Sequence, residues 1–510
     1  MAFLLTLAVL TICVWIAFLG RSKVGKQPPG PEGLPVVGSI FQLDRERPWR
    51  TFAEWKREYG DIVYVRLANQ QVFLLNSAKV AGDLLDRRAS NYSHRPRSVV
   101  QDYLSGGLAM VFLNIGTLWR SMRRATHEAL NVRACSRYHG VQIREGVQLA
   151  TDMLMEAGGW SDHIRRFTNS NITSLLYAKP PLKSSQDPII KFLDTVVDRI
   201  SSASAPGRYL ANHLEFLDYF PQWMSKWKRE CSEDFRVYSA RFMEYWMDVK
   251  NSVTQNNDHT PSFCATLVET QERHGLDDVG SAWLAGVLYL AGYDTTTATL
   301  GWLILALVSH PDVQKKAHEE LDNVVGRSRI PTMDDMEQLP YIRAIMKEAM
   351  RWRPVAPIGV PHASLEDDVY EGYFIPKGSI IVPNILAMNH DPEIYGADAD
   401  QFRPERFLNP DGTHKLSPPD TKDQGQYGFG FGRRICPGRH VAGDMIFAFV
   451  IVLWAMELEP GKDENGNMEV PIFDDVAIGS LSHAKKFKVA SKPRFSEVKG
   501  ILQQAKEYLG

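Results

Sequence analysis

The stretch FGFGRRICPG, residues 429–438, surrounds Cys436 with glycines and arginines. It follows the spacing F-x-x-G-x-R-x-C-x-G, and five matching positions carry a low risk of a chance match. Two simpler interpretations are a buried free cysteine and a phosphate-binding loop of a dinucleotide fold. The phosphate-binding loop needs a third glycine where Ile435 stands and a strand before the first glycine, and the sequence has neither.

The chemistry around Cys436 favours a thiolate that binds haem. Neighbouring cations and the N-terminus of a helix both stabilise a thiolate. Gly432 and Gly438 would let the backbone approach the sulfur and donate N–H groups to it. Arg434 could reach a haem propionate, and Phe429 could shield the sulfur. We therefore expect Cys436 to be the axial ligand of a haem iron.

A second motif lies upstream, inside a long apolar segment. Residues 277–309 are nearly free of proline, which predicts a helix of about thirty residues. The segment AGYDTT at 291–296 is too polar for a membrane span, so we expect a buried core helix. Asp294 and Thr295 would supply an acid–alcohol relay for protons beside an oxygen groove. A polar kink is the alternative, because glycine and threonine weaken helices.

Glu348 and Arg351 form an E-x-x-R pair in a predicted helix. This spacing is weak evidence by itself, since Glu233 and Arg236 show it as well and read as a solvated pair on a helix surface. The first pair is followed by FRPERF, whose Arg406 could complete a Glu–Arg–Arg cluster.

Taken with one further motif, the chain resembles the cytochrome P-450 haem-thiolate monooxygenases. The resemblance implies that the cluster of Glu348, Arg351 and Arg406 is structural. Trp119 and Arg123 match the W-x-x-x-R helix of that family, in which the arginine meets a haem propionate. The resemblance also offers His362 as a propionate partner, although a surface histidine is nearly as good an explanation. The motifs occur in the order of the family, and the stretch from Gly359 to Phe407 looks most like fungal secondary-metabolism members.

The first residues differ from the rest of the chain. Residues 2–20 carry no charge, and three basic residues follow between 21 and 26. Such a run is long enough to span a membrane, and its flanking charges favour a retained anchor over a cleaved signal. We expect an anchor at 1–20, a basic and proline-rich hinge at 21–39, and one catalytic domain at 40–510. The positive-inside rule places that domain in the cytosol, at the endoplasmic reticulum membrane.

The composition is that of a globular protein, with 44% hydrophobic and 23% charged residues and a formal charge of −2. The near-neutral charge argues against a nucleic-acid binder with a basic surface. Five scattered cysteines without a C-x-x-C pair indicate neither a disulfide framework nor a structural zinc site.

Residues 117–130 predict a basic amphipathic helix, residues 440–456 predict a late apolar helix, and residues 61–76 predict two strands around a short turn. Strong helical signals with few strands predict a mainly α, α-rich α+β fold. The resemblance implies that this is the P-450 fold, with a long central helix and small β-sheets.

The resemblance implies a monooxygenase that inserts one oxygen atom of O2 into a lipophilic small molecule, with a terpenoid as the first choice. It implies haem b as cofactor and electrons from NADPH through a separate NADPH–cytochrome P-450 reductase, because the chain is too short to hold flavin domains as well. Arginines near the thiolate would face this acidic partner. The rivals are a haem-thiolate isomerase or dehydratase that needs no O2, and a non-enzymatic haem sensor. The family layout suggests these substrate-facing residues: Val99, Leu104, Tyr293, Ile358, Val360 and Ile478.

Overall fold

Two groups of chain segments make most of their contacts internally, and each is described by itself. Unit 1 comprises residues 1–97, 358–388 and 431–434, and unit 2 comprises 98–357, 389–430 and 435–510. A computed structural model describes residues 25–44, 46–204, 208–212, 214–255, 259–462, 465–469, 471, 473–478 and 481–509. The predicted anchor, 1–20, and the beginning of the predicted hinge lie outside the described residues. No helix within these ranges is long and apolar enough to cross a membrane.

Unit 1 is built on a small mixed sheet. Its strand order is β1-β2-β6-β3, in which β2 and β6 are parallel and the other pairs antiparallel, and β4 and β5 form a separate hairpin. The strands are β1 (Ile62–Leu67), β2 (Gln70–Leu75), β3 (His362–Ala363), β4 (Asp368–Tyr370), β5 (Tyr373–Ile375) and β6 (Ile380–Pro383). The helices and turns are η1 (Ile40–Gln42), α2 (Pro48–Tyr59), α3 (Ala78–Ala81), η2 (Gly82–Arg87), α4 (Ala89–Tyr92), α17 (Ile385–Asn389) and η9 (Gly432–Arg434).

Helix α2 covers the sheet of unit 1. Pro48 opens the helix, where its missing N–H costs nothing, and Gly60 follows it with a positive φ of 93°. Phe52 and Trp55 form its buried face and pack in one cluster with valines and a leucine of β1, β2 and β6. The prediction of two strands around a short turn at 61–76 is confirmed by β1 and β2.

Unit 2 is helical, with two short strand pairs, β7 with β10 and β8 with β9. Its main helices are α5 (Val99–Ser105), α6 (Thr117–Leu130), α7 (Val132–Cys135), α8 (His139–Met155), α9 (Trp160–Tyr177), α10 (Pro188–Ser204), α11 (Lys226–Gln255), α12 (Phe263–Glu269), α13 (Gln271–His274), α14 (Asp278–Ser309), α15 (Pro311–Val324), α16 (Pro340–Trp352), α18 (Pro392–Tyr395), α19 (Arg439–Ile446), α20 (Ala448–Ala455) and α21 (Val498–Leu509). The shorter 3-10 turns are η3 (Ser136–Tyr138), η4 (Ala157–Gly159), η5 (Leu210–Asn212), η6 (Glu215–Tyr219), η7 (Met333–Gln338) and η8 (Pro404–Phe407). The strands are β7 (Met456–Pro460), β8 (Asp475–Ile478), β9 (Leu481–Ala484) and β10 (Val489–Pro493).

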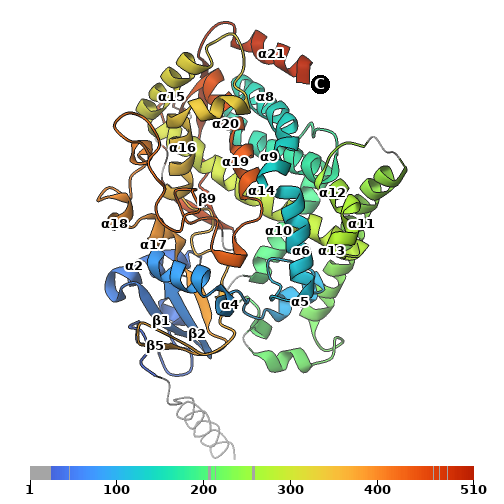
Figure 1. Ribbon diagram of the computed structural model, residues 1–510, viewed down its shortest axis with the longest axis vertical. Coiled ribbons are helices and arrows are strands. Elements are labelled where there is room, and N and C mark those ends of the chain that lie inside the picture. The colour runs from blue at the N-terminus through green and yellow to red at the C-terminus, as the bar shows by residue number, and fades with distance from the viewer. Residues whose placement is uncertain are drawn as a thin grey trace, which may run out of the picture. The chain divides into compact units, whose positions relative to one another are not determined.

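Helix α14 runs through the interior of unit 2 and packs against α9, α11, α16 and β9 (Figure 1). The side chain of Asp277 caps its start by accepting the N–H of Gly280 at 2.7 Å. Pro311 opens the next helix directly after the end of α14. Most residues of α14 are buried on every side of the helix, as its apolar composition requires. The predicted long core helix at 277–309 is therefore confirmed.

The predicted late helix at 440–456 is only partly right. The chain forms α19 and α20, which meet at Phe447, and Met456 already begins strand β7. The N–H of Phe447 donates to Asp444 O at 3.2 Å, and the N–H of Val450 donates to Phe447 O at 2.8 Å, so the helical hydrogen bonds shift by one residue at this point. Apolar periodicity continued through the junction and could not reveal the break.

Candidate active site

The segment around Cys436 is a tight turn leading into α19. The N–H of Cys436 donates to Phe429 O at 2.8 Å, which closes the turn across the arginine-containing stretch. Gly438 occupies the position immediately before α19, and its carbonyl accepts the N–H of Ala442 at 2.9 Å. The cysteine thus stands just before a helix N-terminus, where the helix dipole stabilises negative charge.

The electrostatic environment of the Cys436 thiol contains opposing contributions. Burial raises its pKa, while the N–H of Gly438 and then the guanidinium groups of Arg123 and Arg439 act to lower it. Arg123 extends from α6 and donates from Nη2 to Ile435 O at 2.6 Å. Arg439 donates to Cys436 O at 3.3 Å. Burial is the largest of these contributions, so the pKa of the thiol lies above its ordinary value, and one N–H and two cations oppose that effect.

Cys436 lines a cavity within unit 2. The thiolate turn contributes Phe429 and Gly438, and α14 contributes a row of small and hydroxylated residues. Apolar side chains of α9 and α19 cover much of the remaining wall. The α14 residues are Leu288, Ala291, Gly292, Thr295, Thr296 and Thr299. A cysteine and a threonine far apart in the sequence thus face one mostly apolar space.

The two polar residues of the α14 motif are placed differently. Thr295 faces the cavity and donates its hydroxyl hydrogen to Ala291 O at 2.7 Å, which leaves its oxygen lone pairs as acceptors. Asp294 is buried and lies 3.3 Å, Oδ1 to Nε2, from His483 of β9. The residues therefore occupy neighbouring faces of the helix, as a step of one residue requires. Gly292 is needed for packing, because a Cβ there would lie 2.8 Å from Ile172.

Unit 1 contains a buried cluster of basic side chains. Arg434 donates from Nε to Ser93 O at 2.8 Å, and Arg95 donates from Nη1 to Val360 O at 2.7 Å. His362 is buried, and its Nδ1 donates to Tyr92 O at 2.7 Å. Burial, and then Arg434, lowers the pKa of Arg95 to about 9.

The same surroundings lower the pKa of His362. Burial first, then Arg95, lowers the pKa of His362 to about 3. At neutral pH the imidazole of His362 is therefore uncharged beside the guanidinium group of Arg95. Sequence reasoning missed Arg95, although the segment HRPR at 94–97 is strongly basic.

Gly432 has a different role from the one its position suggested. Its N–H donates to the carboxylate of Asp86, not to the sulfur of Cys436. Its φ is 53°, and a Cβ would lie 2.1 Å from Leu85 O, so only glycine fits this close approach of two backbones. The glycine holds the loop against η2 within unit 1.

The residues present fit haem b, which combines an iron, an apolar macrocycle and two carboxylates. In unit 2, Cys436 lines an apolar cavity in which a Cβ on Gly438 would meet nothing within 4 Å, and Ala291 is exposed in the middle of an otherwise buried helix. In unit 1, Arg95 and Arg434 form a cationic cluster that two carboxylates would neutralise.

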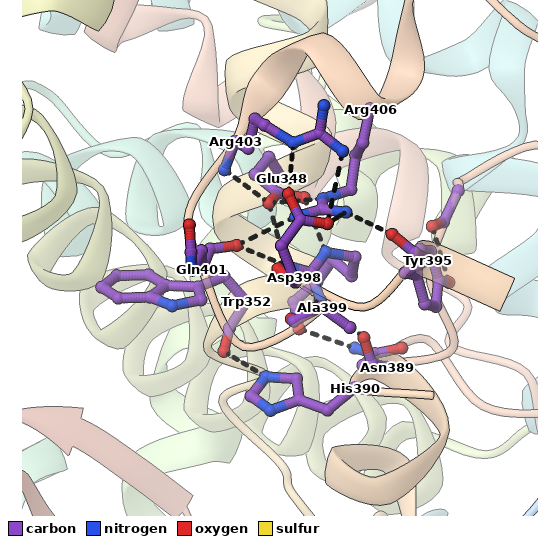
Figure 2. Close-up of polar contacts among 12 residues, drawn as sticks. Glu348, Trp352, Asn389, His390, Tyr395, Asp398, Ala399, Gln401, Arg403 and Arg406 are labelled. Atoms are coloured by element: carbon purple, nitrogen blue, oxygen red, sulfur yellow. Dashed lines mark hydrogen bonds and ion pairs between the residues drawn. The ribbon is translucent and has the colours of Figure 1, made fainter. Parts of the chain in front are cut away.

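The predicted Glu–Arg–Arg cluster is assembled in the interior of unit 2 (Figure 2). Glu348 and Arg351 have no exposed side-chain surface, and their two hydrogen bonds measure 2.6 and 2.8 Å. Arg406 of η8 donates from Nε to Glu348 Oε1 at 2.9 Å, and the N–H of Arg403 donates to the same oxygen at 2.8 Å. One buried carboxylate thus receives two guanidinium groups and a backbone N–H.

The arginines of this cluster also bind the loop between α17 and η8. Arg351 donates to the carbonyl groups of Asn389 and Ala399, each at 2.6 Å, and to Gln401 O at 3.0 Å. Arg406 donates to the carbonyl of Tyr395 and to Asp398 O at 3.0 Å. This irregular backbone has no helix or sheet to satisfy its carbonyl groups, and the two guanidinium groups donate hydrogen bonds to them. This arrangement supports a structural role, as expected.

The remaining predicted residues are distributed unevenly. Trp119 is buried on α6, one turn before Arg123. Tyr293 was expected to face substrate, but its hydroxyl donates to Asp194 of α10 at 2.8 Å, outside the cavity lining. Tyr293 is one helical step from the cavity-facing row, and the half-buried carboxylate of Asp194 on α10 satisfies its hydroxyl.

The other substrate-facing predictions are likewise absent from the lining of this cavity. Val99 and Leu104 are buried in packing on α5, Ile358 packs against the core of unit 1, and Val360 is exposed. Ile478 ends β8, and its side chain lies outside the described part of the chain. Sequence reasoning missed the residues that do line the cavity, such as Leu175, Leu176 and Val355, because their apolar pattern is also that of ordinary core.

The comparisons with known proteins agree with this geometry. The cytochrome P-450 family model matches residues 28–488. A cytochrome P-450 monooxygenase of Armillaria gallica is 44% identical, with 99% of this chain and 97% of the relative aligned. Cytochrome P-450 monooxygenase 58 of Postia placenta is 42% identical over 98% and 94%, and cytochrome P-450 monooxygenase iboC of Amanita muscaria is 36% identical over 98% and 97%.

The chain belongs to the cytochrome P-450 family. The predicted resemblance to fungal members is confirmed, because these relatives come from fungi. Membership implies a haem cofactor and a monooxygenase reaction, in which O2 and a lipophilic substrate are used with a redox partner.

Proposed function

We propose that this protein is a membrane-anchored monooxygenase that hydroxylates a lipophilic secondary metabolite, with a terpenoid as the first substrate class to test. Electrons would come from NADPH through a separate NADPH–cytochrome P-450 reductase. The observation that carries the proposal is the shared cavity of Cys436 and Thr295, whose other walls are largely apolar. Apolar walls with few polar groups favour a hydrocarbon-rich substrate over a sugar or a phosphate ester.

Each residue has a defined task in this proposal. Cys436 would ligate the haem iron, and thiolate ligation is the feature by which this cofactor favours O–O bond cleavage. Gly438, Arg123 and Arg439 would stabilise the thiolate form. Thr295 would hold a water or a reacting oxygen through its lone pairs, because its own hydrogen is donated to Ala291 O.

A reductase partner is supported by exposed positive charge. Arg120 and Arg124 are exposed on α6, the helix whose Arg123 reaches the thiolate turn. Arg433 is an exposed residue of unit 1. Charges of this kind steer an acidic partner and change its on-rate more than the final affinity. Arg120→Glu combined with Arg124→Glu should raise the reductase concentration needed for half-maximal turnover and leave haem content unchanged.

The first test is spectroscopic. The reduced, CO-bound protein should show the absorption typical of thiolate-ligated haem, and Cys436→Ala should abolish it. Cys135→Ala is a matched control, since that buried cysteine lies on α7 and outside the cavity lining. A histidine-type spectrum in the wild type would overturn the assignment of Cys436.

The second test asks for turnover. Co-expression with a reductase and a panel of terpenoids, steroids and aromatic polyketides, followed by mass spectrometry, should give a product heavier by one oxygen and consume NADPH. Product formation without NADPH would instead indicate an isomerase or dehydratase. Haem binding with no turnover of any substrate would favour a sensor.

The third test concerns Thr295. Thr295→Ala keeps the cavity apolar, so CO binding and substrate-induced spectra should stay normal. The product formed per NADPH should fall while peroxide rises, since general-acid assistance is typically worth about 10²–10⁴-fold. Thr297→Ala is the matched control on α14, because that hydroxyl donates to Tyr293 O and bonds Thr168 at 2.9 Å.

The predicted anchor calls for its own experiment. Deleting residues 1–20 should release the protein from microsomal membranes without changing its CO spectrum. Protease treatment of intact microsomes should degrade the catalytic body if that body faces the cytosol. Protection from protease would contradict the proposed topology.

A further inference from the structure

The acid of the α14 motif, Asp294, is buried. Asp294 does not line the cavity that its neighbour Thr295 faces. Its Oδ1 lies 3.3 Å from Nε2 of His483, and the two side chains are 12% and 14% exposed. Within the described residues, this buried nitrogen makes no hydrogen bond of ordinary geometry. The imidazole therefore has Asp294 at ion-pair distance, and a small rotation of either side chain would align a hydrogen bond.

His483 is mounted rigidly relative to α14. It belongs to β9, and its neighbour Ser482 is held from two directions. The N–H of Ser482 donates to Val355 O at 2.8 Å, and Nε1 of Trp302, itself on α14, donates to Ser482 O at 3.0 Å. The strand carrying the imidazole is thus attached directly to the helix carrying the carboxylate. The hydrogen bond from the buried Trp302 side chain limits how far this strand can move from α14.

An exposed acid lies within electrostatic range of Asp294. Asp198 is an exposed residue of α10. Its pKa is raised, first by partial burial and then by the carboxylates of Asp194 and Asp294. The charge of Asp294 is therefore felt by an acid that water reaches. From β8, Asp475 lies beside the strand, with Oδ2 3.4 Å from Ser482 Oγ.

Resting on the proposed monooxygenase function, we propose that His483 is a positioning residue for the proton supply. Its ring holds the Asp294 carboxylate in one orientation on the face of α14 that does not line the cavity, so that Asp294 takes up protons from water and passes them toward Thr295. No bond other than those to the transferred proton is made or broken in this step. The proton comes from water, and Asp294 returns to its starting state by taking up another.

The chemistry of imidazole suits this task. A neutral imidazole carries one donor nitrogen, and a carboxylate oxygen can accept from it. A carboxylate held by such a ring keeps a defined orientation, whereas an isolated buried carboxylate loses its hydration without a replacement. The residue is therefore matched to hold Asp294.

Four variants test the proposal in the full-length, haem-bound protein: His483→Leu, His483→Gln, Asp294→Asn, and Asp294→Asn combined with His483→Leu. Glutamine places a donor nitrogen near the position of Nε2, while leucine removes it and keeps the volume. The control is His163→Leu, because His163 lies 3.8 Å from Glu156 at the surface. Three quantities are measured for each: the urea midpoint of the ferric protein, the substrate dissociation constant from the spectral shift, and the product per NADPH.

His483→Leu is expected to lower the product formed per NADPH by a factor between about 10 and about 10². The larger factor is roughly the smallest contribution that general acid–base catalysis typically makes. The substrate dissociation constant should be unchanged, and His483→Gln should restore most of the loss. The double variant should be no worse than Asp294→Asn alone, in product per NADPH and in urea midpoint, because the two residues act as one unit.

Three results would overturn the proposal. The first is a product per NADPH in His483→Leu equal to that of the wild type. The second is a double variant whose loss of product per NADPH equals the two single losses multiplied, and the third is an effect confined to substrate affinity or to the position of oxidation. If the wild type turns over no substrate, the proposed function fails, and the urea midpoints still decide whether the pair exists. Additive midpoints in the four variants would then reject it.

Discussion

Two glutamate–arginine pairs in unit 2 have the same spacing and nearly the same bond geometry, yet their surroundings differ completely. Arg351 of α16 binds Glu348 through hydrogen bonds of 2.6 and 2.8 Å. Arg236 of α11 binds Glu233 through hydrogen bonds of 2.9 and 2.5 Å. The side chains of the first pair are fully buried, while Glu233 and Arg236 are 58% and 71% exposed.

The difference shows that burial and additional partners, and not the pair itself, decide what a charged contact does. Water would replace either partner of the exposed pair at little cost. Glu348 has left water entirely, and it is compensated by Arg351, Arg406 and the N–H of Arg403. Removing one member of that group leaves the other charges unpaired in the protein interior, which solvates charge poorly.

The largest effect is expected from Glu348→Ala. Two buried guanidinium groups lose their carboxylate, and breaking a buried pair costs about 3–5 kcal/mol of unfolding free energy. The protein should accumulate poorly and retain little haem, as measured by the CO spectrum per milligram of protein. A folded, haem-replete variant with altered regiochemistry would contradict the structural role.

A smaller loss is expected from Arg351→Lys, which keeps the charge and loses the planar fork. Lysine has three donors, whereas Arg351 serves Glu348 and three backbone carbonyls. We expect about 1.5–3 kcal/mol of destabilisation, the range for hydrogen bonds to charged groups, measured by urea unfolding. Arg236→Lys is the matched control and should leave the urea midpoint where it is.

A still smaller effect is expected from acid, through a histidine beside the buried cluster. Burial lowers the pKa of His390 to about 4, against 6.5 for an unperturbed histidine, and its Nε2 donates to Trp352 O at 2.9 Å. As pH falls below 6.5, His390 binds a proton in the unfolded chain but stays neutral in the folded chain, so the free energy of unfolding decreases.

For this single group the loss between pH 7 and pH 5.5 should be about 1 kcal/mol. His390→Gln should show a correspondingly flatter dependence of the urea midpoint on pH over that range. An identical slope in wild type and variant would mean that His390 is not the group that responds.

The smallest effect is expected from Glu233→Ala. Hydrogen bonding to Arg236 lowers the pKa of Glu233, but water surrounds both side chains. The urea midpoint and the haem content should therefore match the wild type at pH 7. A clear loss of stability would show that exposure is not what separates the two pairs.

Much of the fold was predictable because its signals are local. The apolar run at 277–309 became α14, and the basic amphipathic segment at 117–130 became α6 with the same limits. The strands β7 to β10 were not predicted, since they pair residues that lie far apart or carry little alternation. The break at Phe447 was hidden within a continuous apolar run.

The candidate site divides in the same way. Cys436, Thr295 and the Glu–Arg–Arg cluster could be found because fixed spacing marks them, and the structure places Cys436 and Thr295 on one cavity. The cavity walls could not be found, because Leu175 or Val355 has the same apolar character as any core residue. Tyr293 was expected to face substrate from the layout of the family, but its hydroxyl binds a half-buried acid on another helix.

The sequence by itself determined the family, the thiolate turn and the long core helix, because each is written in the order and spacing of nearby residues. Tertiary structure alone decided which polar groups meet. His483 is distant in sequence from Asp294, and Arg95 from His362, and no periodicity links either pair. The pKa values of these side chains depend on burial and on partners from other segments of the chain. Burial removes the water that stabilises a charge, so the same side chain behaves differently in the fold.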